Sequence, residues 1–472
     1  MFDCCRVPGP EGLDWSVTYA KQGETGLSGH IAVFRNNRVW KLEATKDDRI
    51  LSTEEFQKQI EQIYRESEGQ YPGIGVLGAN NRDVWAKDYN ELASSGENSD
   101  ILHMIQSAAF AICLESSSPS SPIAHSRDLW HGHITADGVP IGLRNRWVDK
   151  PVQFIVFDNA EAGIMGEHSV MDGTPTVRLC DDVLEALHNP AFDHGSVSSP
   201  ADIRPTPMDW QVSPVIKDAL VQADAAARSL IESQEMTFHL TSYGKAAIKA
   251  FGVSPDSWAQ MIIQLAYRRL LGTAPRAGGT YEAATTRRFY KGRTEAIRVV
   301  SSESDAWVAS MDDSSVSLHE RKKLFDAATK KHIGYAKTAG MGQGIDRHFF
   351  GKCGRNAQQV TCTKTWDYAG MKKCLKEGEE APALFSDPVF QSATYWVLST
   401  SAIFSKHFPV YGWGEVVPDG YGVAYMTGYD DRLQYTITSR KEMPNEQFMT
   451  EIVKAAEDIY ALHAGESAKS KL

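Results

Sequence analysis

Long apolar runs are missing from this sequence. No stretch approaches the roughly 20 apolar residues that a membrane-spanning helix requires, so we expect no transmembrane segment. The segment Met1 to Trp15 has neither an apolar core behind basic residues nor an Arg-rich amphipathic pattern, so we expect no signal or transit peptide there. An excess of positive charge is missing too, because the formal net charge is -11. Nucleic-acid phosphates require a basic surface, so we expect no nucleic-acid partner.

Cysteine is scarce and irregularly spaced. The 472 residues include seven cysteines and no C-x-x-C pair. An odd number without such spacing predicts free thiols in a reducing compartment rather than disulfides or a zinc site. His131-Gly132-His133 is the other metal candidate, but it offers two imidazoles on a glycine-containing stretch with no third ligand nearby. We therefore expect both histidines to face solvent and no metal to bind.

The composition, with 42% hydrophobic and 23% charged residues, is that of an ordinary globular protein long enough for two α/β domains. The stretch from Asn189 to Pro214 is rich in Pro, Ser and Asp and is the best linker in the sequence. It predicts a boundary near residue 210, which gives domains 1–210 and 211–472.

Hydrophobic periodicity predicts alternating strands and helices in the first half of the chain. We expect two short strands over His30–Leu42, a helix over Glu54–Tyr64 with Thr53 as N-cap, and a helix around Leu102–Cys113. The run Pro151–Phe157 is apolar, β-branched and too short for a helix, which indicates a buried strand. A further helix is expected to end near Leu187.

In the second half, Ser254-Pro255-Asp256 has the features of a helix start, with a capping hydroxyl, a proline at the first position and an acid in the first turn. That helix is expected to stop at Gly272. The other expected elements are a helix over Val215–Gln234, paired strands over Val423–Thr427 and Leu433–Thr438, and a final helix capped by Asn445.

One histidine stands in an unusual turn. His168 follows the Pro151–Phe157 strand, lies between Glu167 and Asp172, and precedes Gly173. A single histidine is more often a core or surface residue than a catalytic one. Its unperturbed pKa nevertheless suits a general base if a nearby acceptor fixes the tautomer.

Several short sequence blocks before and after His168 add to the evidence about this histidine. They are His168 with Thr174-Pro175-Thr176, Asn145-Arg146-Trp147, Tyr243-Gly244-Lys245, Ser254-Pro255-Asp256, Thr280-Tyr281-Glu282, Gly292-Arg293-Thr294, Asp346-Arg347-His348, Leu398-Ser399-Thr400-Ser401 and Val417–Gly422. Each block alone is a weak signal. Together and in order, they make the chain resemble the carnitine/choline acyltransferase family. The resemblance implies two related α/β domains of the chloramphenicol-acetyltransferase type, with the active site in a tunnel between them.

The resemblance also implies the chemistry. His168 would take a proton from the 3-hydroxyl of carnitine, or from the thiol of coenzyme A in reverse, and transfer the acyl group directly. Asp172 would orient the imidazole or its segment; the alternative is a solvated turn carboxylate. Ser401 would donate to the oxyanion and Ser399 would contact the carnitine carboxylate, although the same residues could simply end a strand.

Coenzyme A or acetyl-coenzyme A enters this scheme as a co-substrate, with no permanently bound cofactor. Lys245 and Lys249 are four residues apart and would project from the same face of a helix. They could simply be exposed to solvent, or they could bind phosphate. By resemblance they bind the phosphates of coenzyme A, and the segment from Lys249 through Ser254 to Asp256 lines the nucleotide.

For carnitine, the resemblance assigns Tyr281, Thr294 and Arg347. The planar fork of arginine suits a carboxylate, which choline does not have, so Arg347 favours carnitine over choline. Tyr411, ten residues after Ser401, would close the acyl pocket and favour an acetyl group. The alternatives are a choline or medium-chain carnitine acyltransferase, or an inactive scaffold that binds coenzyme A or carnitine.

The chain departs from the family pattern at several places. The resemblance implies residues ahead of the point that matches Met1, so we expect a chain that lacks the family's N-terminal segment. Residues 352–370 have no family counterpart and predict a poorly ordered insertion. By the resemblance, two coenzyme A contacts of the family fall on Ile333 and Ala402, and a carnitine-contacting serine falls on Ala283. Ser470-Lys471-Leu472, at the end of the tail 465–472, matches the address that a peroxisomal import receptor reads. We expect a peroxisomal monomer.

Overall fold

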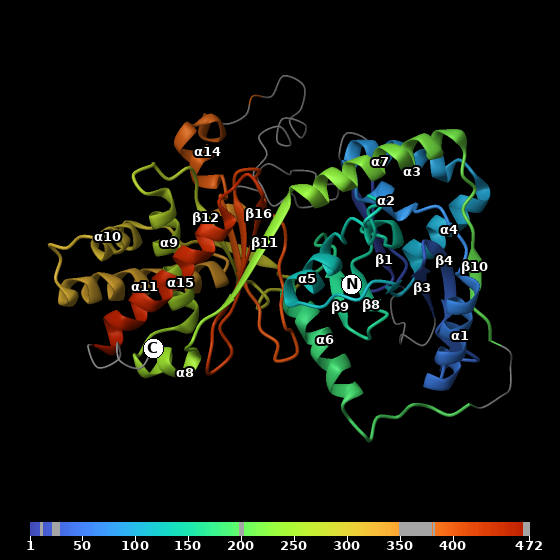
Figure 1. Ribbon diagram of the computed structural model, residues 1–472, viewed down its shortest axis with the longest axis horizontal. Coiled ribbons are helices and arrows are strands. Elements are labelled where there is room, and N and C mark those ends of the chain that lie inside the picture. Colours follow the sequence, from blue (N-terminus) through green and yellow to red (C-terminus); the bar gives the residue numbers. More distant parts are fainter. Residues whose placement is uncertain (10–12, 21–28, 198–202, 349–379, 381–382, 466–472) are drawn as a thin grey trace. The chain divides into compact units, whose positions relative to one another are not determined.

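The chain folds into two compact units, Met1–Glu232 and the part that begins at Ser233. This computed structural model describes residues 1–9, 13–20, 29–197, 203–348, 380 and 383–465 (Figure 1). The expected insertion at 352–370 and the tail beyond Gly465 lie outside the described residues. The division falls after the boundary expected near residue 210, because the linker contains strand β10 (Thr206–Met208), which pairs with β4, and helix α7 (Pro214–Ser233) buries Ile216 in the first core.

The first unit is built on a mixed six-stranded sheet with the order β10-β4-β3-β7-β8-β9. Its remaining strands are β3 (His30–Arg35), β4 (Arg38–Glu43), β7 (Ala111–Glu115), β8 (Val152–Phe157) and β9 (Ala162–Gly166). Strands β3, β7 and β8 are parallel neighbours, whereas β4 and β9 run antiparallel to theirs. The expected strands at 30–42 and 151–157 are therefore confirmed. Hairpins β1–β2 (Cys4–Val7, Trp15–Thr18) and β5–β6 (Thr45–Lys46, Arg49–Ile50) lie outside this sheet.

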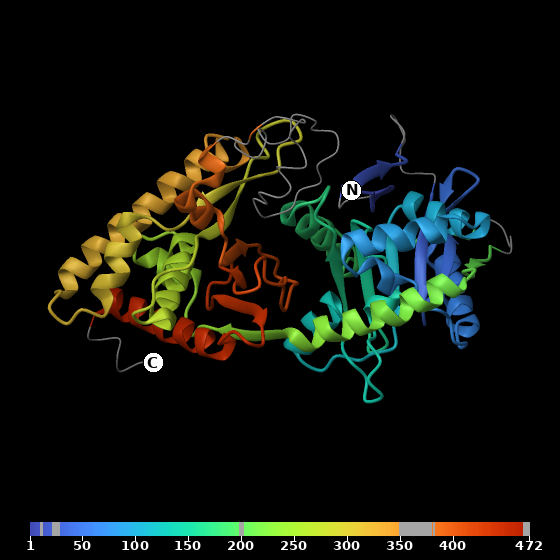
Figure 2. The same cartoon turned by 90° about the horizontal axis from the view of Figure 1, so that it is seen from above.

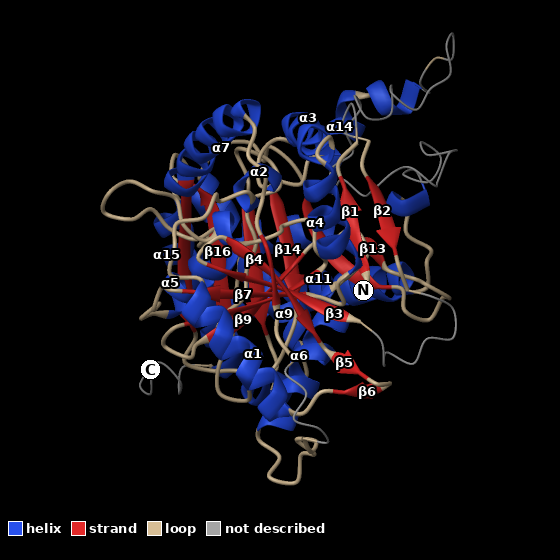
Figure 3. Cartoon of the chain, turned by 90° about the vertical axis from the view of Figure 1, so that its right-hand side faces the viewer, coloured by secondary structure: helices blue, strands red, loops and turns tan. Residues whose placement is uncertain are grey.

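Helices pack against both faces of the first sheet because apolar side chains alternate between the two faces of its strands. Figure 3 distinguishes the strands (red) from the helices (blue). Ile31 and Val33 pack against α1 (Thr53–Glu66) on one face. Ala32 and Phe34 join the core on the other face, formed with α2 (Gly75–Gly78), α3 (Arg82–Ala93), α4 (Gly96–Ser107) and α7. The unit also contains α5 (Pro122–Trp130), η2 (Leu143–Asn145) and α6 (Gly173–Leu187). Helix α6 confirms the helix expected to end near Leu187.

Two sequence predictions in this unit are wrong in detail. The helix expected around 102–113 ends at Ser107, and Cys113 lies in β7, where Ile112 and Leu114 make the local pattern that of a strand. The N-cap of α1 is Ser52 rather than Thr53, because the Ser52 hydroxyl accepts from the Glu55 amide in a reciprocal capping box.

The second unit has its own mixed six-stranded sheet, with the order β11-β16-β15-β14-β12-β13. The strands are β11 (Gln234–Leu240), β12 (Thr280–Thr285), β13 (Thr294–Arg298), β14 (Leu398–Ala402), β15 (Tyr421–Met426) and β16 (Gln434–Arg440). Strand β14 runs parallel to both of its neighbours, β12 and β15, while β15 and β16 form the expected antiparallel pair. The α/β class is confirmed in both units.

Helices α9 (Pro255–Leu271), α10 (Ser302–Met311), α11 (Leu318–Gly340) and α15 (Asn445–Ala464) build the core on one side of this sheet (Figure 2). Helix α9 has the expected Ser254 cap and stops at Gly272, as predicted. The remaining helices are α8 (Lys245–Ala250), η3 (Ala383–Ser386) and α14 (Pro388–Thr394). Asn445 does not cap α15 with its side chain as expected. It is buried and donates to the Ser439 hydroxyl, so it ties the helix start to β16.

None of the described helices combines the length and the apolar character needed to cross a membrane. Four cysteines fall in the described residues, and Cys4, Cys5, Cys113 and Cys180 are buried free thiols, as the spacing predicted.

Candidate active site

The His168 turn connects β9 to α6 in the first unit. The imidazole Nδ1 lies 2.6 Å from the Met171 carbonyl oxygen and 3.4 Å from Asp172 Oδ1. Because a carbonyl oxygen can only accept, Nδ1 carries the proton, which makes Nε2 the acceptor nitrogen in the neutral form of the ring. The side chain is 48% exposed. The fixed tautomer is the one that a general base acting through Nε2 requires.

The turn is tied to the start of the chain by charged groups. Glu167 accepts from Arg6 Nη1 at 3.2 Å through one oxygen and from the Ser169 amide at 2.9 Å through the other. Arg6 also donates to Asp14 at 2.7 Å, and the Asp14 side chain is fully buried. Sequence reasoning missed this link, because no local pattern relates residues 6 and 167. The contact restrains the residue immediately before His168.

Asp172 occupies the position directly before α6. Its side chain makes no capping bond to the helix and lies against the imidazole instead, with 18% of the side chain exposed. With its carboxylate beside the ring and most of its side chain covered, Asp172 is not a fully solvated turn residue.

In the second unit, β14 carries the serines singled out in the sequence. Ser399 is buried and pairs with Tyr281 of β12, while Ser401 lies near the carboxyl end of the strand. Because side chains alternate along a strand, Ser399 and Ser401 share one face of the sheet, and Thr400 points to the other. Thr400 accepts from Gln260 of α9 at 2.8 Å, which identifies that other face as the helix-covered one.

The hydroxyl of Tyr411 has a structural position that the sequence did not reveal. It donates to the Ser401 carbonyl oxygen at 2.5 Å and accepts from the amides of Ile403 and Tyr425 at 3.1 and 3.2 Å. Burial raises its pKa, so it remains a neutral phenol. Tyr411 therefore joins the ends of β14 and β15 directly beside Ser401, whatever its ring contributes to an acyl pocket.

The three predicted carnitine residues converge, although they come from distant parts of the sequence. Arg347 Nη2 lies 3.2 Å from Thr294 Oγ1 and 3.3 Å from the Tyr281 hydroxyl, and Arg347 Nε donates to the Thr294 carbonyl. The Arg347 amide lies 3.2 Å from a carboxylate oxygen of Glu295. Burial is the main cause that raises the pKa of Glu295. The cluster offers a guanidinium and two hydroxyls, a set suited to a carboxylate.

The predicted coenzyme A residues lie on two neighbouring helices. Lys245 and Lys249 occupy the ends of the short helix α8, where Lys245 Nζ contacts the Gly428 carbonyl at 2.8 Å and Asp430 at 3.0 Å, and Lys249 is exposed. Ser254 caps α9, and Asp256 in the first turn accepts from the Tyr425 hydroxyl at 2.8 Å. A phosphate at Lys245 would have to compete with Asp430.

The His131–His133 stretch differs from its expectation. His131 is only 2% exposed, and burial lowers its pKa to about 4. His133 is paired with Asp128 at 2.7 Å, which raises its pKa. The expectation that both histidines face solvent is wrong for His131, because its ring packs at a tilt against Trp130 and its Nδ1 contacts the Gly132 carbonyl. Within the described residues, one group of three ligand-type side chains, Asp256, Glu282 and His332 in the other unit, has its polar atoms within 4.8 Å of one another.

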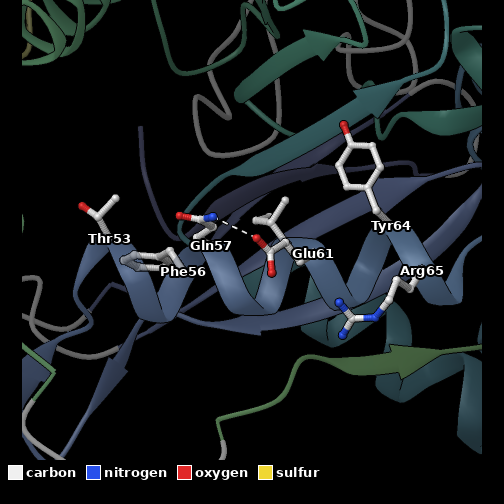
Figure 4. Close-up of a pocket in the computed structure, with 7 residues that line it drawn as sticks. Thr53, Phe56, Gln57, Glu61, Tyr64 and Arg65 are labelled. Carbon is white, nitrogen blue, oxygen red and sulfur yellow. Dashed lines mark hydrogen bonds between the residues drawn. The ribbon is translucent and has the colours of Figure 1, made fainter.

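A shallow pocket lies along α1 and contains none of the predicted site residues. Thr53, Phe56, Gln57, Ile60, Glu61, Tyr64 and Arg65 line it (Figure 4). All of them come from a single helix face, and Gln57 donates to Glu61 at 2.8 Å. The pocket offers no convergent set of groups for acyl transfer.

The chain is similar in sequence to known proteins over most of its length. A family model described as "Choline/Carnitine o-acyltransferase" matches residues 1–454. The mitochondrial carnitine O-acetyltransferase of Saccharomyces cerevisiae is 33% identical over 90% of this chain and 60% of its own length, and the Homo sapiens carnitine O-acetyltransferase is 33% identical over 90% and 64%. The Bos taurus peroxisomal carnitine O-octanoyltransferase is 31% identical over 94% and 69%, and the Danio rerio choline O-acetyltransferase is 29% identical over 94% and 66%.

The chain thus spans less than two thirds of the length of the carnitine O-acetyltransferases that it matches. Among solved structures, the epimerization domain of tyrocidine synthetase B has a TM-score of 0.36 at 9% identity, covering 78% of this chain and 82% of that one. A TM-score of this size supports no conclusion about function.

Proposed function

The chain belongs to the choline/carnitine O-acyltransferase family, and from that premise we propose that it transfers an acetyl group between coenzyme A and the hydroxyl of L-carnitine. The observation that carries the choice of carnitine is the convergence of Arg347 with Tyr281 and Thr294. A guanidinium placed beside two hydroxyls binds the carboxylate that carnitine has and choline lacks.

In the proposed reaction, His168 Nε2 takes the proton from the carnitine hydroxyl as its oxygen attacks the thioester carbonyl. Ser401 donates to the oxyanion, the carbon–sulfur bond breaks, and the thiolate of coenzyme A takes the proton back from the imidazole. The Met171 carbonyl supports this role by holding the proton on Nδ1. Asp172 stabilises the imidazolium that forms between the two steps.

Release of thiol from acetyl-coenzyme A tests this proposal. We expect release that depends on L-carnitine and is much slower with choline. Arg347→Gln should raise KM for carnitine by roughly tenfold to a hundredfold, because a hydrogen bond to a charged group contributes about 1.5–3 kcal/mol. Exposed Arg288 supplies the matched control, Arg288→Gln, with an unchanged KM. Binding of acetyl-coenzyme A and carnitine without thiol release would instead support the inactive scaffold.

The short acyl group is proposed from Tyr411. Its hydroxyl is fixed on β14 and β15, so its ring cannot swing away to admit a longer chain. Octanoyl-coenzyme A should therefore be a poor substrate of the unmodified protein, and Tyr411→Ala should accept it better relative to acetyl-coenzyme A. An unchanged octanoyl-to-acetyl ratio of kcat/KM would show that Tyr411 does not set the acyl length.

A peroxisomal location is proposed from Ser470-Lys471-Leu472. A fluorescent protein fused ahead of the whole chain should collect in peroxisomes and should become diffuse when Leu472 is deleted. A fusion with the intact end that stays diffuse would contradict the import proposal.

A further inference from the structure

Three titratable side chains meet on the helix-covered side of the second sheet. Glu282 of β12 and His332 of α11 are both 4% exposed, and Asp256 lies at the start of α9. Their ligand atoms lie within 4.8 Å of one another. Glu282 follows Tyr281 in the strand, so the two side chains point to opposite faces. The cluster therefore lies directly behind the face that carries the proposed carnitine site.

His332 uses both of its ring nitrogens within this cluster. Nε2 lies 2.7 Å from Glu282 Oε2, and Nδ1 lies 2.8 Å from the Ser257 hydroxyl. The Nε2 hydrogen is donated to Glu282. The serine hydroxyl donates to Nδ1 when the ring is neutral and accepts from it when the ring is charged, so both charge states keep the same contacts. Both ring nitrogens of His332 therefore make hydrogen bonds to protein groups, one in β12 and one in the first turn of α9.

Hydrogen bonds extend the cluster to both halves of the proposed site. The Tyr425 hydroxyl donates to Asp256 at 2.8 Å and accepts from Gln260 Nε2 at 2.9 Å. Gln260 also donates to Thr400, whose hydroxyl donates to the Tyr281 carbonyl at 2.8 Å. One continuous network thus connects the first turn of α9 to β14 and to the backbone of Tyr281.

The charges of the cluster depend on one another. Burial alone lowers the pKa of His332, but the hydrogen bond to Glu282 and the charges of Glu282 and Asp256 outweigh it, and the pKa is raised. Burial and then the charge of Asp256 raise the pKa of Glu282 to about 7, against the opposing effect of His332. As the pH rises above 7, the cluster loses protons, and the carboxylate of buried Glu282 and that of partly exposed Asp256 repel each other.

We propose that His332 is a positioning residue that clamps the first turn of α9 to β12, and so fixes the acyl-donor end of the site to the acceptor end. The inference rests on the proposed function, because the roles of Ser254 and Asp256 toward coenzyme A are part of that proposal. When His332 is protonated, its charge holds both carboxylates in place. When the cluster loses protons, repulsion between the carboxylates loosens the start of α9, and acetyl-coenzyme A binds less tightly.

Calorimetric titration with acetyl-coenzyme A between pH 7 and 9 tests the clamp. The His168→Ala protein is the background, because it removes the proposed catalytic base, and acetyl-coenzyme A has no titrating thiol. We expect Kd to rise by roughly tenfold across this range, the factor that corresponds to one unit of pKa coupled to binding. Glu282→Gln keeps an acceptor for His332 but cannot gain the second negative charge, so its Kd should change little with pH.

His319 is exposed on the same helix and supplies the control, since His319→Gln should keep the pH profile of the background. A profile that is flat in the background, or equally steep in Glu282→Gln, would overturn the clamp while leaving the proposed function intact. The pH dependence of Kd in the His168→Ala protein is measured without a change at Glu282. A flat profile there would therefore refute the clamp even if Glu282→Gln failed to fold. Absence of acetyl-coenzyme A binding at every pH would overturn the proposed function, and the clamp with it.

Discussion

Removal of a single hydroxyl, in Tyr411→Phe, separates two roles of this side chain. The variant keeps the ring that is proposed to limit the acyl chain and loses the oxygen that joins β14 to β15. The Ile403 and Tyr425 amides lose their acceptor, and the Ser401 carbonyl loses its donor. The variant therefore tests whether the backbone around Ser401 depends on Tyr411.

The expected loss of stability in Tyr411→Phe follows from the burial of the groups that lose a hydrogen-bond partner. A buried polar group without a partner costs about 1–3 kcal/mol. Tyr425 is fully buried, so its amide has no access to water, whereas Ile403 is partly exposed and can be solvated. We expect Tyr411→Phe to lower the free energy of unfolding of the second unit by about 2–3 kcal/mol. The value of kcat should fall about tenfold, less than the roughly hundredfold effect of removing an oxyanion donor outright.

Urea unfolding and steady-state kinetics with acetyl-coenzyme A and carnitine measure these effects. Hydrogen exchange at the Tyr425 amide adds a local readout, because that amide should lose protection. Tyr290 is 92% exposed and provides the control. Tyr290→Phe should leave both the free energy of unfolding and kcat unchanged. If Tyr411→Phe kept its unfolding free energy within about 0.5 kcal/mol and kept its kcat, the hydroxyl would not hold the strands around Ser401.

Three further predictions concern the first unit. His168→Gln should lower kcat by roughly a hundredfold or more while leaving the Kd of acetyl-coenzyme A unchanged, and an active variant would exclude His168 as the base. Arg6→Ala should lower kcat by roughly tenfold, because the turn that holds His168 loses its restraint at Glu167; Arg178→Ala, which removes an exposed ion pair, is the control and should have no effect. The hydrogen bond from Arg49 is the main cause that lowers the pKa of Glu55 from 4.5 to about 2, so its stabilising effect is present above pH 4.5 and is lost as the pH falls toward 2. Acid unfolding of Glu55→Gln, followed by circular dichroism, should lack the loss of stability between pH 4.5 and 2 that protonation of Glu55 causes. An acid-unfolding curve like that of the unmodified protein would show that the Arg49–Glu55 pair does not stabilise the fold.

Local signals in the sequence were sufficient where neighbouring residues determine the structure. The capping serine, proline and acid at 254–256 and the glycine at 272 predicted both ends of α9, because helix termini are satisfied by groups a few residues away. The apolar run at 151–157 predicted β8 for a similar reason. The resemblance of ordered blocks identified the family, which the match over residues 1–454 confirms.

The same local reasoning failed where a distant segment completes an element. The stretch up to Met208 has the composition of a linker, yet β10 pairs with β4, so the division between the units moves to Glu232. Thr53 and Ser52 are both acceptable caps by residue type, and only the backbone geometry selects Ser52.

By itself, the sequence determined the family, the α/β class and the identity of the candidate groups, because these depend on residue type and order. The tertiary structure decided which groups meet: it brought Arg347 to Tyr281 and Thr294, Arg6 to Glu167, and His332 to Glu282. It also gave the Tyr411 hydroxyl its place between two strands. Such contacts join residues far apart in the chain, and they form only when packing of the sheets and helices brings those residues within hydrogen-bonding distance.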